Sequence, residues 1–223
     1  MARLRLHTGG RFRSWLGRRF GGDAELGDRV WRRMLHGIGA LVLLYYILPA
    51  RFFVLLTTEE VLLAALGAIL VLEALRLFAG LEMPTIREYE RRRMASYAFY
   101  AIALSVTVLL FPPVIGVVVV LGVAFVDPLI GELRRRPGLA WSHWLGPIVV
   151  YIGLTTAALV LAFAWDPIAA FEIAVLLAVV AVAVERPRIQ FLDDDIAMTL
   201  VPALLFALIL YVVPGLPGHP WGP

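Results

Sequence analysis

Long apolar runs alternate with short polar segments along most of the chain. A helix that crosses a membrane needs roughly 20 mainly apolar residues, and about 17 suffice. Seven segments meet this requirement: 34–50, 54–78, 95–111, 113–130, 144–164, 168–184 and 196–213. Pro112 and Pro113 separate the third from the fourth, because proline lacks an amide hydrogen and restricts the residue before it. The pattern predicts an all-α, polytopic bundle of about seven transmembrane helices.

The arginines lie on alternate sides of these predicted helices. Nine fall within residues 1–33, and most of the others fall in the loops after the second, fourth and sixth helices: Arg87, Arg91, Arg92, Arg93, Arg134, Arg135, Arg136, Arg186 and Arg188. Short cytoplasmic loops collect basic residues, so these segments are expected in the cytoplasm. The chain then divides into a basic cytoplasmic segment (1–33), a transmembrane domain (34–214) and a short non-cytoplasmic tail (215–223).

Composition narrows the classes of chemistry. Apolar residues make up 61% of the chain, and the mean hydropathy is +0.85, as expected of an integral protein of a prokaryotic cell membrane or an endomembrane. The chain contains no cysteine, which excludes disulfides, thiolate metal sites and a cysteine nucleophile. It also contains no lysine, so phosphate must be bound by arginine or by backbone amides.

Ionisable residues in or beside the apolar segments are candidates for function, because burying them in hydrocarbon is costly. They gather at the predicted cytoplasmic ends of the helices: Arg32, Arg33, His36, Glu73, Arg76, Asp127, Arg134, Arg135, Arg136, Glu185, Asp193, Asp194 and Asp195. Acids, arginines and a histidine at one membrane boundary suit a site that binds a metal ion and phosphate.

Each of these groups also has a simpler interpretation. Glu73 and Arg76 share a helix face, so they form either a buried ion pair or a nucleotide contact. His36 is either a structural hydrogen-bonding residue or a catalytic group. The acids 193–195 are either a solvated loop or ligands of Mg²⁺.

Four short motifs, in order along the chain, carry a family resemblance. They are Arg32-Arg33-Met34-Leu35-His36, Glu73-x-x-Arg76, Val126-Asp127-Pro128 followed by Arg135, Arg136 and Gly138, and Glu185 followed by Asp193-Asp194-Asp195-Ile196. Together they resemble the signatures of the dolichol kinase and phytol kinase group of polyprenol kinases, over almost the whole chain.

This resemblance implies transfer of the γ-phosphoryl group of CTP, or of ATP or UTP, to a long isoprenoid alcohol such as dolichol, polyprenol, geranylgeraniol or phytol. It implies Mg²⁺ held by Asp127 and Asp194, with Asp193 or Asp195 assisting, and His36 contacting nucleotide or accepting the hydroxyl proton. The residues implied to bind the nucleotide are Arg32, Arg33, Glu73, Arg76, Arg134, Arg135, Arg136, Gly138 and Glu185. The expected partners are the alcohol, the nucleotide and membrane lipids, and not nucleic acid.

The chain also departs from the family pattern. Val126 replaces a glycine, and Trp141, Ser142 and His143 stand where the family has a Lys-Ser/Thr-x-Glu-Gly segment. Two alternatives therefore stay open. One is a CTP-dependent cytidylyltransferase acting on a lipid phosphate, which releases pyrophosphate instead of CDP. The other is an inactive membrane relative or a transporter, and a transporter would place ionisable groups near the bilayer midplane.

Overall fold

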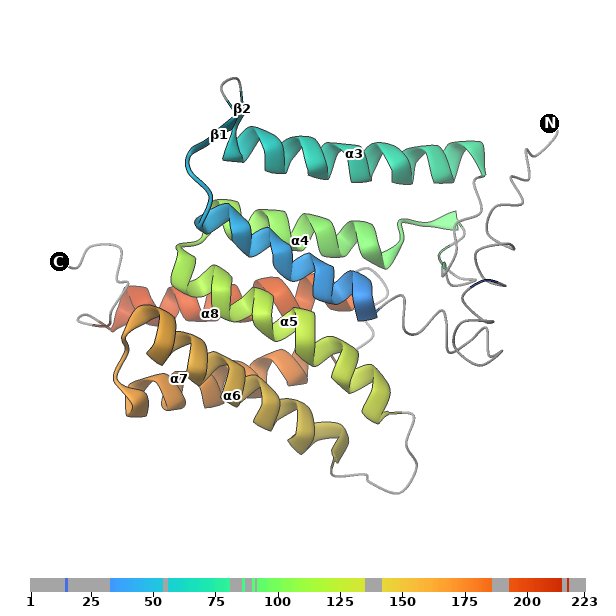
Figure 1. The fold of residues 1–223 in the computed structure, drawn as a ribbon. Helices are drawn as coiled ribbons and strands as arrows, with labels where there is room; N and C mark the ends of the chain where they lie inside the picture. Colours follow the sequence, from blue (N-terminus) through green and yellow to red (C-terminus); the bar gives the residue numbers. More distant parts are fainter. Residues whose placement is uncertain are drawn as a thin grey trace.

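The structure, a computed structural model, describes residues 15, 33–53, 56–80, 86, 90, 92–134, 142–185, 193–213 and 216. Residues 33–39 are α-helical and continue as a 3-10 helix, η1 (Ala40–Tyr46). A two-stranded antiparallel hairpin follows, with β1 (Arg51–Phe53) and β2 (Leu56–Thr57). The remaining elements are α3 (Thr58–Ala79), α4 (Ser96–Leu110), α5 (Pro113–Leu133), α6 (Ser142–Phe163), α7 (Pro167–Val184) and α8 (Asp194–Val212). Figure 1 shows them as one elongated bundle.

Five of the described helices, α3, α5, α6, α7 and α8, are long and apolar enough to cross a membrane. Helix α4 has 15 residues and is therefore about 22 Å long, shorter than the roughly 30 Å of a bilayer's hydrocarbon core. The first predicted apolar segment, 34–50, corresponds to the helical residues 33–39 and to η1. The prediction of a helical membrane protein agrees with this architecture.

The boundaries of the first two predicted segments differ from the structure. The helix expected over 54–78 begins at Thr58, because residues 51–53 and 56–57 form the two strands of the hairpin. Thr57 caps it: its side chain accepts a hydrogen bond from the Glu60 amide, and the Glu60 carboxylate accepts one from the Thr57 amide. The segment expected as a helix over 34–50 winds more tightly after Gly37 and Gly39, residues with a low preference for the α-helix.

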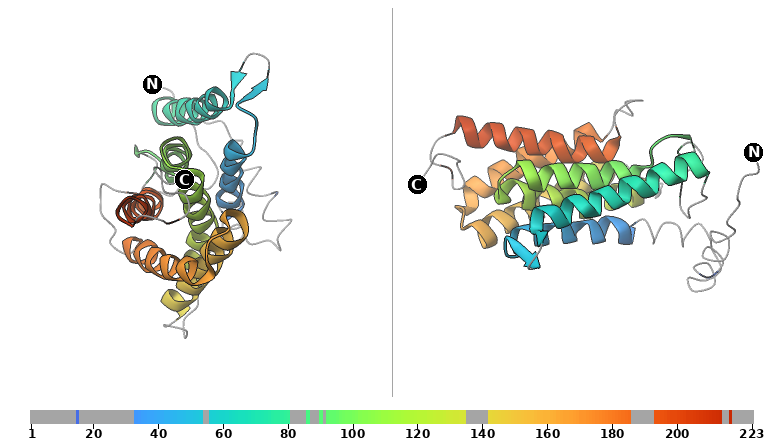
Figure 2. Two further views of the ribbon diagram at one scale, coloured as in Figure 1. Left: turned by 90° about the vertical axis from the view of Figure 1, so that its left-hand side faces the viewer. Right: turned by 90° about the horizontal axis from the view of Figure 1, so that it is seen from above.

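Helix α5 lies at the centre of the bundle and packs against α4, α6, α8 and η1. Helix α3 lies at the edge, as Figure 2 shows, and packs mainly against α4 and η1. Its outer side exposes large apolar side chains, including Phe78, which is 91% exposed. Such a surface suits contact with lipid, where an apolar side chain meets an apolar solvent.

Three tyrosine rings lie directly on glycines of neighbouring segments: Tyr100 on Gly39, Tyr46 on Gly116 and Tyr151 on Gly122. A Cβ atom added at these glycines would come within 2.4, 2.0 and 2.3 Å of an atom of the tyrosine side chain. Small residues allow such close approach, and membrane helix interfaces depend on it. These contacts therefore fix how η1, α4, α5 and α6 sit against one another.

The helices run alternately up and down, so their polar ends meet. Residues 33–39 and helices α4, α6 and α8 begin at the end of the bundle on the right of Figure 1, where α3, α5 and α7 finish. The described candidate residues lie at this end, and the β hairpin lies at the other. The fold thus brings distant parts of the sequence to one end of the bundle.

The Tyr151 contact generates the first prediction. The substitution Gly122→Ala should lower the free energy of unfolding by about 1–3 kcal/mol, because the fully buried Tyr151 ring would have to move. Gly153→Ala, on the exposed side of α6 with nothing within 4 Å of the added Cβ, is the matched control and should be neutral or slightly stabilising. Thermal unfolding in detergent measures both, and equal midpoints for the two variants would contradict the prediction.

Candidate metal and phosphate site

Three side chains from three helical segments converge at the polar end: His36 from residues 33–39, Asp127 from α5 and Asp195 from α8. One possible ligand atom from each lies within 4.8 Å of the other two. The Nε2 atom of His36 is 3.6 Å from the Oδ2 atom of Asp127. These residues are 91 and 68 positions apart in the sequence (127 − 36 and 195 − 127), so only the folded chain makes the cluster.

The separation of two of these ligand atoms is compatible with a shared divalent cation. Two ligands about 2.1 Å from one ion lie about 3.0 Å apart when adjacent and about 4.2 Å apart when opposite. The His36–Asp127 distance of 3.6 Å falls between these values. Asp195 is near enough to supply a third ligand after a small movement of its side chain.

One acid of the cluster lies in a poorly hydrated place among other acids. Asp195 is only 6% exposed, and Asp193 and Asp194 come directly before it. The ion pairs of Arg33, Arg76 and Arg134 are with glutamates outside the cluster. A buried acid beside other acids is stabilised by a cation or by taking up a proton.

The start of α8 fixes the position of Asp195. Asp193 is the N-cap, and its Oδ1 atom accepts a hydrogen bond from the Asp195 amide at 3.1 Å. One turn later, the Thr199 hydroxyl donates to the Asp195 carbonyl oxygen. Of the three consecutive acids, one therefore caps the helix while another faces Asp127.

His36 is held by Tyr100 of α4. The Tyr100 hydroxyl donates to the His36 carbonyl oxygen at 2.9 Å, and the two rings lie 4.7 Å apart between centroids. Tyr100 is buried, and Gly39 leaves room for its ring. This contact sets the orientation of the imidazole toward Asp127.

Ser96, the first residue of α4, connects the cluster with the preceding loop. Its hydroxyl lies 2.9 Å from Oε1 of Glu90 and 3.3 Å from Oδ2 of Asp193. A hydroxyl has one proton to donate, so it bonds one of these carboxylates at a time. Ser96 thus links the α3–α4 loop to the start of α8.

Glu73 and Arg76 form a buried pair that closes the same loop onto α3. Arg76 makes two hydrogen bonds to Glu73, at 2.6 and 2.7 Å, and donates to the carbonyl oxygens of Glu90 and Arg93. Glu73 also accepts from the Ala95 amide and the Tyr97 hydroxyl. The sequence left two interpretations of this pair, a buried ion pair and a nucleotide contact. These contacts support the buried ion pair, which holds the end of α3 in place.

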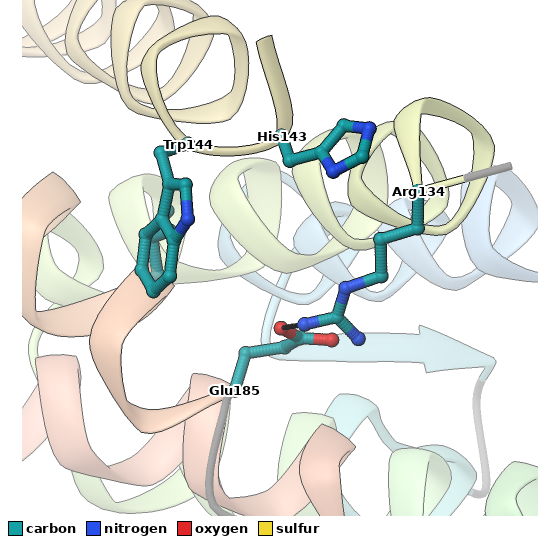
Figure 3. A pocket seen from close by; sticks show the side chains of 5 residues that line it. Arg134, His143, Trp144 and Glu185 are labelled. Carbon is teal, nitrogen blue, oxygen red and sulfur yellow. Dashed lines mark hydrogen bonds and ion pairs between the residues drawn. The ribbon is translucent and has the colours of Figure 1, made fainter. Parts of the chain in front are cut away.

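Arg33 and Arg134 each join two parts of the polar end. Arg33 pairs with Glu132 of α5, and Arg134, just after α5, pairs with Glu185, just after α7. A cavity of about 90 Å³ lies beside the second pair, lined by Arg134, His143, Trp144, Val182 and Glu185. Figure 3 shows Trp144 and His143 from the start of α6 facing this ion pair.

Burial raises the pKa of Glu185 from 4.5 to about 7, and the charges of Asp127 and Asp194 add to the effect. The Arg134 guanidinium acts in the opposite direction, but it is itself partly exposed and does not outweigh the burial.

The sequence located this group of residues without resolving their individual roles. Asp127 and Asp194 were expected as the main ligands, whereas the structure brings Asp195 to Asp127 and leaves Asp194 outside the three-residue cluster. Arg32, Arg135, Arg136 and Gly138 lie outside the described residues. Sequence reasoning did not single out Ser96, Tyr100 and Trp144, since a serine or an aromatic residue near an apolar helix end is too common to be a signal.

No family model, curated protein or solved structure matches this chain.

The buried ion pair generates the second prediction. Arg76→Met should lower the free energy of unfolding by about 3–5 kcal/mol, because Glu73 would be left buried with its counter-charge removed. Arg92→Met, at an exposed position in the same loop, should change it by less than about 0.5 kcal/mol. Thermal or denaturant unfolding in detergent gives the comparison. A nucleotide-contact role would instead leave stability unchanged and weaken nucleotide binding.

The pKa of Glu185 generates the third prediction. The folded state holds the proton more tightly than the unfolded chain, so this residue's contribution to stability is full below pH 4.5 and is lost as the pH rises to about 7. Glu185→Gln removes the titrating group. The difference in unfolding midpoint between the unsubstituted protein and this variant should therefore change in favour of the variant over that pH range, and a constant difference would contradict the prediction.

Proposed function

We propose that this protein is a metal-dependent phosphotransferase that moves the γ-phosphoryl group of a nucleoside triphosphate to the hydroxyl of a long isoprenoid alcohol. CTP is the expected donor, with ATP or UTP as alternatives, and Mg²⁺ is the expected ion. The proposal combines the resemblance to polyprenol kinases with the site geometry.

The observation that carries the proposal is the meeting of His36, Asp127 and Asp195 at one end of an apolar bundle. An isoprenoid alcohol arrives from lipid, whereas a nucleotide arrives from water. A charged cluster at the end of apolar helices is open to both. Ionisable groups near the middle of the helices would instead have favoured a transporter.

The proposed topology has seven spans, with the N-terminus and the polar end in the cytoplasm. It rests on the arginine distribution and on the alternating directions of the helices. For α4 and for residues 33–46, which are short, it requires tilted neighbours or a locally thinner bilayer.

The residues of the site suit phosphoryl transfer, a reaction that depends mainly on positioning and on neutralising phosphate charge. A divalent ion bound by Asp127 and Asp195 would offset the charge of the phosphates. Arg33 and Arg134, partly exposed beside the cluster, can exchange their glutamate partners for phosphate oxygens. We place the alcohol hydroxyl beside Asp127, which is partly exposed.

The cavity between Arg134, Trp144 and Glu185 could hold part of the nucleotide. At about 90 Å³ it is much smaller than the roughly 300–1,000 Å³ of a complete small-molecule site. It offers an aromatic side chain, a guanidinium and a carboxyl group next to the cluster. We therefore assign it to the nucleotide side of the site.

The fourth prediction tests the activity. Purified protein in detergent, given each labelled nucleoside triphosphate, a divalent ion and farnesol, geranylgeraniol, phytol or dolichol, should phosphorylate at least one alcohol. Asp127→Asn should reduce turnover by at least about a hundredfold, because the side chain keeps its size and loses its charge. Product analysis should show the nucleoside diphosphate.

The matched control is Asp166→Asn, the N-cap of α7 at the opposite end of the bundle. Asparagine caps a helix as well as aspartate, so this variant should stay folded and active. Pyrophosphate as the product would indicate the cytidylyltransferase instead. Silence with every alcohol and nucleotide would end the phosphotransferase proposal.

A further inference from the structure

We propose that His36 is a direct ligand of the metal ion, and that the site therefore binds Mn²⁺ more tightly than Mg²⁺. This inference deepens the proposed function, and it rests on that function in placing the ion at the site of phosphoryl transfer. It replaces the expectation that His36 contacts nucleotide or accepts the hydroxyl proton.

The distance between His36 and Asp127 carries the first step. At 3.6 Å, Nε2 and Oδ2 are farther apart than the 2.7–3.2 Å of an ordinary N–H···O hydrogen bond. Two ligands that share one ion lie about 3.0–4.2 Å apart. The pair is therefore spaced as two ligands of one ion, and Asp195 supplies the third ligand within 4.8 Å.

The position of the imidazole is built into the fold. Tyr100 donates to the His36 carbonyl oxygen and lies against its ring, and Gly39 makes the space for Tyr100. A ligand held in this way loses little further freedom when an ion binds. The support therefore comes from another helix, α4, and from a glycine in the segment of His36 itself.

The acids around Asp195 carry the next step. Asp195 is buried, with Asp193 and Asp194 beside it and Asp127 facing it. A divalent cation held by His36, Asp127 and Asp195 would bind where these acids lie closest together.

The ligand atoms select the type of ion. Mg²⁺ prefers oxygen ligands and keeps several of its waters, whereas an imidazole nitrogen suits first-row transition metals. Two carboxylates together with one imidazole suit Mn²⁺, which accepts both kinds of ligand and six-coordinate geometry. Mn²⁺ also binds phosphate oxygens, as the proposed reaction requires.

Electron paramagnetic resonance of Mn²⁺ tests the inference without any enzymatic assay. The purified protein in detergent is titrated with Mn²⁺ alone, and the bound ion is examined by electron spin echo modulation for a directly coordinated ¹⁴N nucleus. His36→Gln removes the proposed ligand. His143→Gln is the matched control, since this second histidine lies at the same polar end but lines the neighbouring cavity.

We expect nitrogen coupling in the unsubstituted protein and in His143→Gln, and its loss in His36→Gln. Mn²⁺ affinity should fall at least about tenfold in His36→Gln, and Mg²⁺ affinity, measured by competition, should fall less. Bound Mn²⁺ with no nitrogen coupling, absence of Mn²⁺ binding, or Mg²⁺ binding as tight as that of Mn²⁺ would overturn the inference.

A measurement on the unsubstituted protein guards against misfolding of the His36 variant. Protein labelled with ¹⁵N-histidine should replace the ¹⁴N modulation with that of ¹⁵N, and an unchanged ¹⁴N signal would exclude a histidine ligand. The outcomes also separate the two proposals. Nitrogen-coordinated Mn²⁺ in a protein that phosphorylates no alcohol would retain this metal site and remove the proposed function. Phosphorylation by a protein whose ion has only oxygen ligands would do the reverse.

Discussion

The structure of the polar end of this bundle depends on how its buried charges pair with one another. Hydrocarbon cannot solvate a carboxylate or a guanidinium, so each one must meet an opposite charge, a hydrogen-bond donor or an ion. Glu73 with Arg76 meets this requirement completely, through two bonds to each other and further bonds to the loop before α4. The arrangement ties the outermost helix, α3, to the rest of the bundle. Arg33 with Glu132 and Arg134 with Glu185 repeat the principle nearer the surface.

The aspartates of the cluster differ from these pairs, because they lie beside one another. Asp193, Asp194 and Asp195 are consecutive, and the almost fully buried Asp195 meets Asp127 and His36. The surrounding packing keeps them there: Tyr100 holds the helix that carries His36, and the N-cap and Thr199 hold the start of α8. Acids and a histidine packed together in this way suit the binding of a cation. This is the physical basis for treating the cluster as the candidate site and the Glu73–Arg76 pair as structural.

The Tyr–Gly contacts connect this local chemistry with the whole bundle. Tyr100 on Gly39 serves His36 directly, whereas Tyr46 on Gly116 and Tyr151 on Gly122 set the distance of α5 from η1 and α6. Asp127 lies on α5 between the contacts of these neighbours and the helix end, so the closeness of the packing determines where its carboxylate stands. When three separate segments form a site, the distances within the site are fixed only as well as those segments pack against one another.

The sequence alone determined the helical, membrane-type architecture, because apolar runs of about 20 residues have few other stable structures. The sequence also contains a signal for the start of α3, because Thr57 and Glu60 form a capping box. The apolar pattern by itself placed that start four residues too early. The sequence further predicted that acids and arginines meet at one boundary, and the structure brings Arg33, Asp127, Arg134, Glu185 and Asp195 to one end of the bundle. Only the tertiary structure decided that Asp195 faces Asp127 while Asp193 caps α8, because successive helical residues point about 100° apart and the rotation of a helix is set by its neighbours. The tertiary structure also decided that Glu73 and Arg76 bind the backbone of Glu90, Arg93 and Ala95. This contact depends on how the segments pack, so no local sequence pattern predicts it.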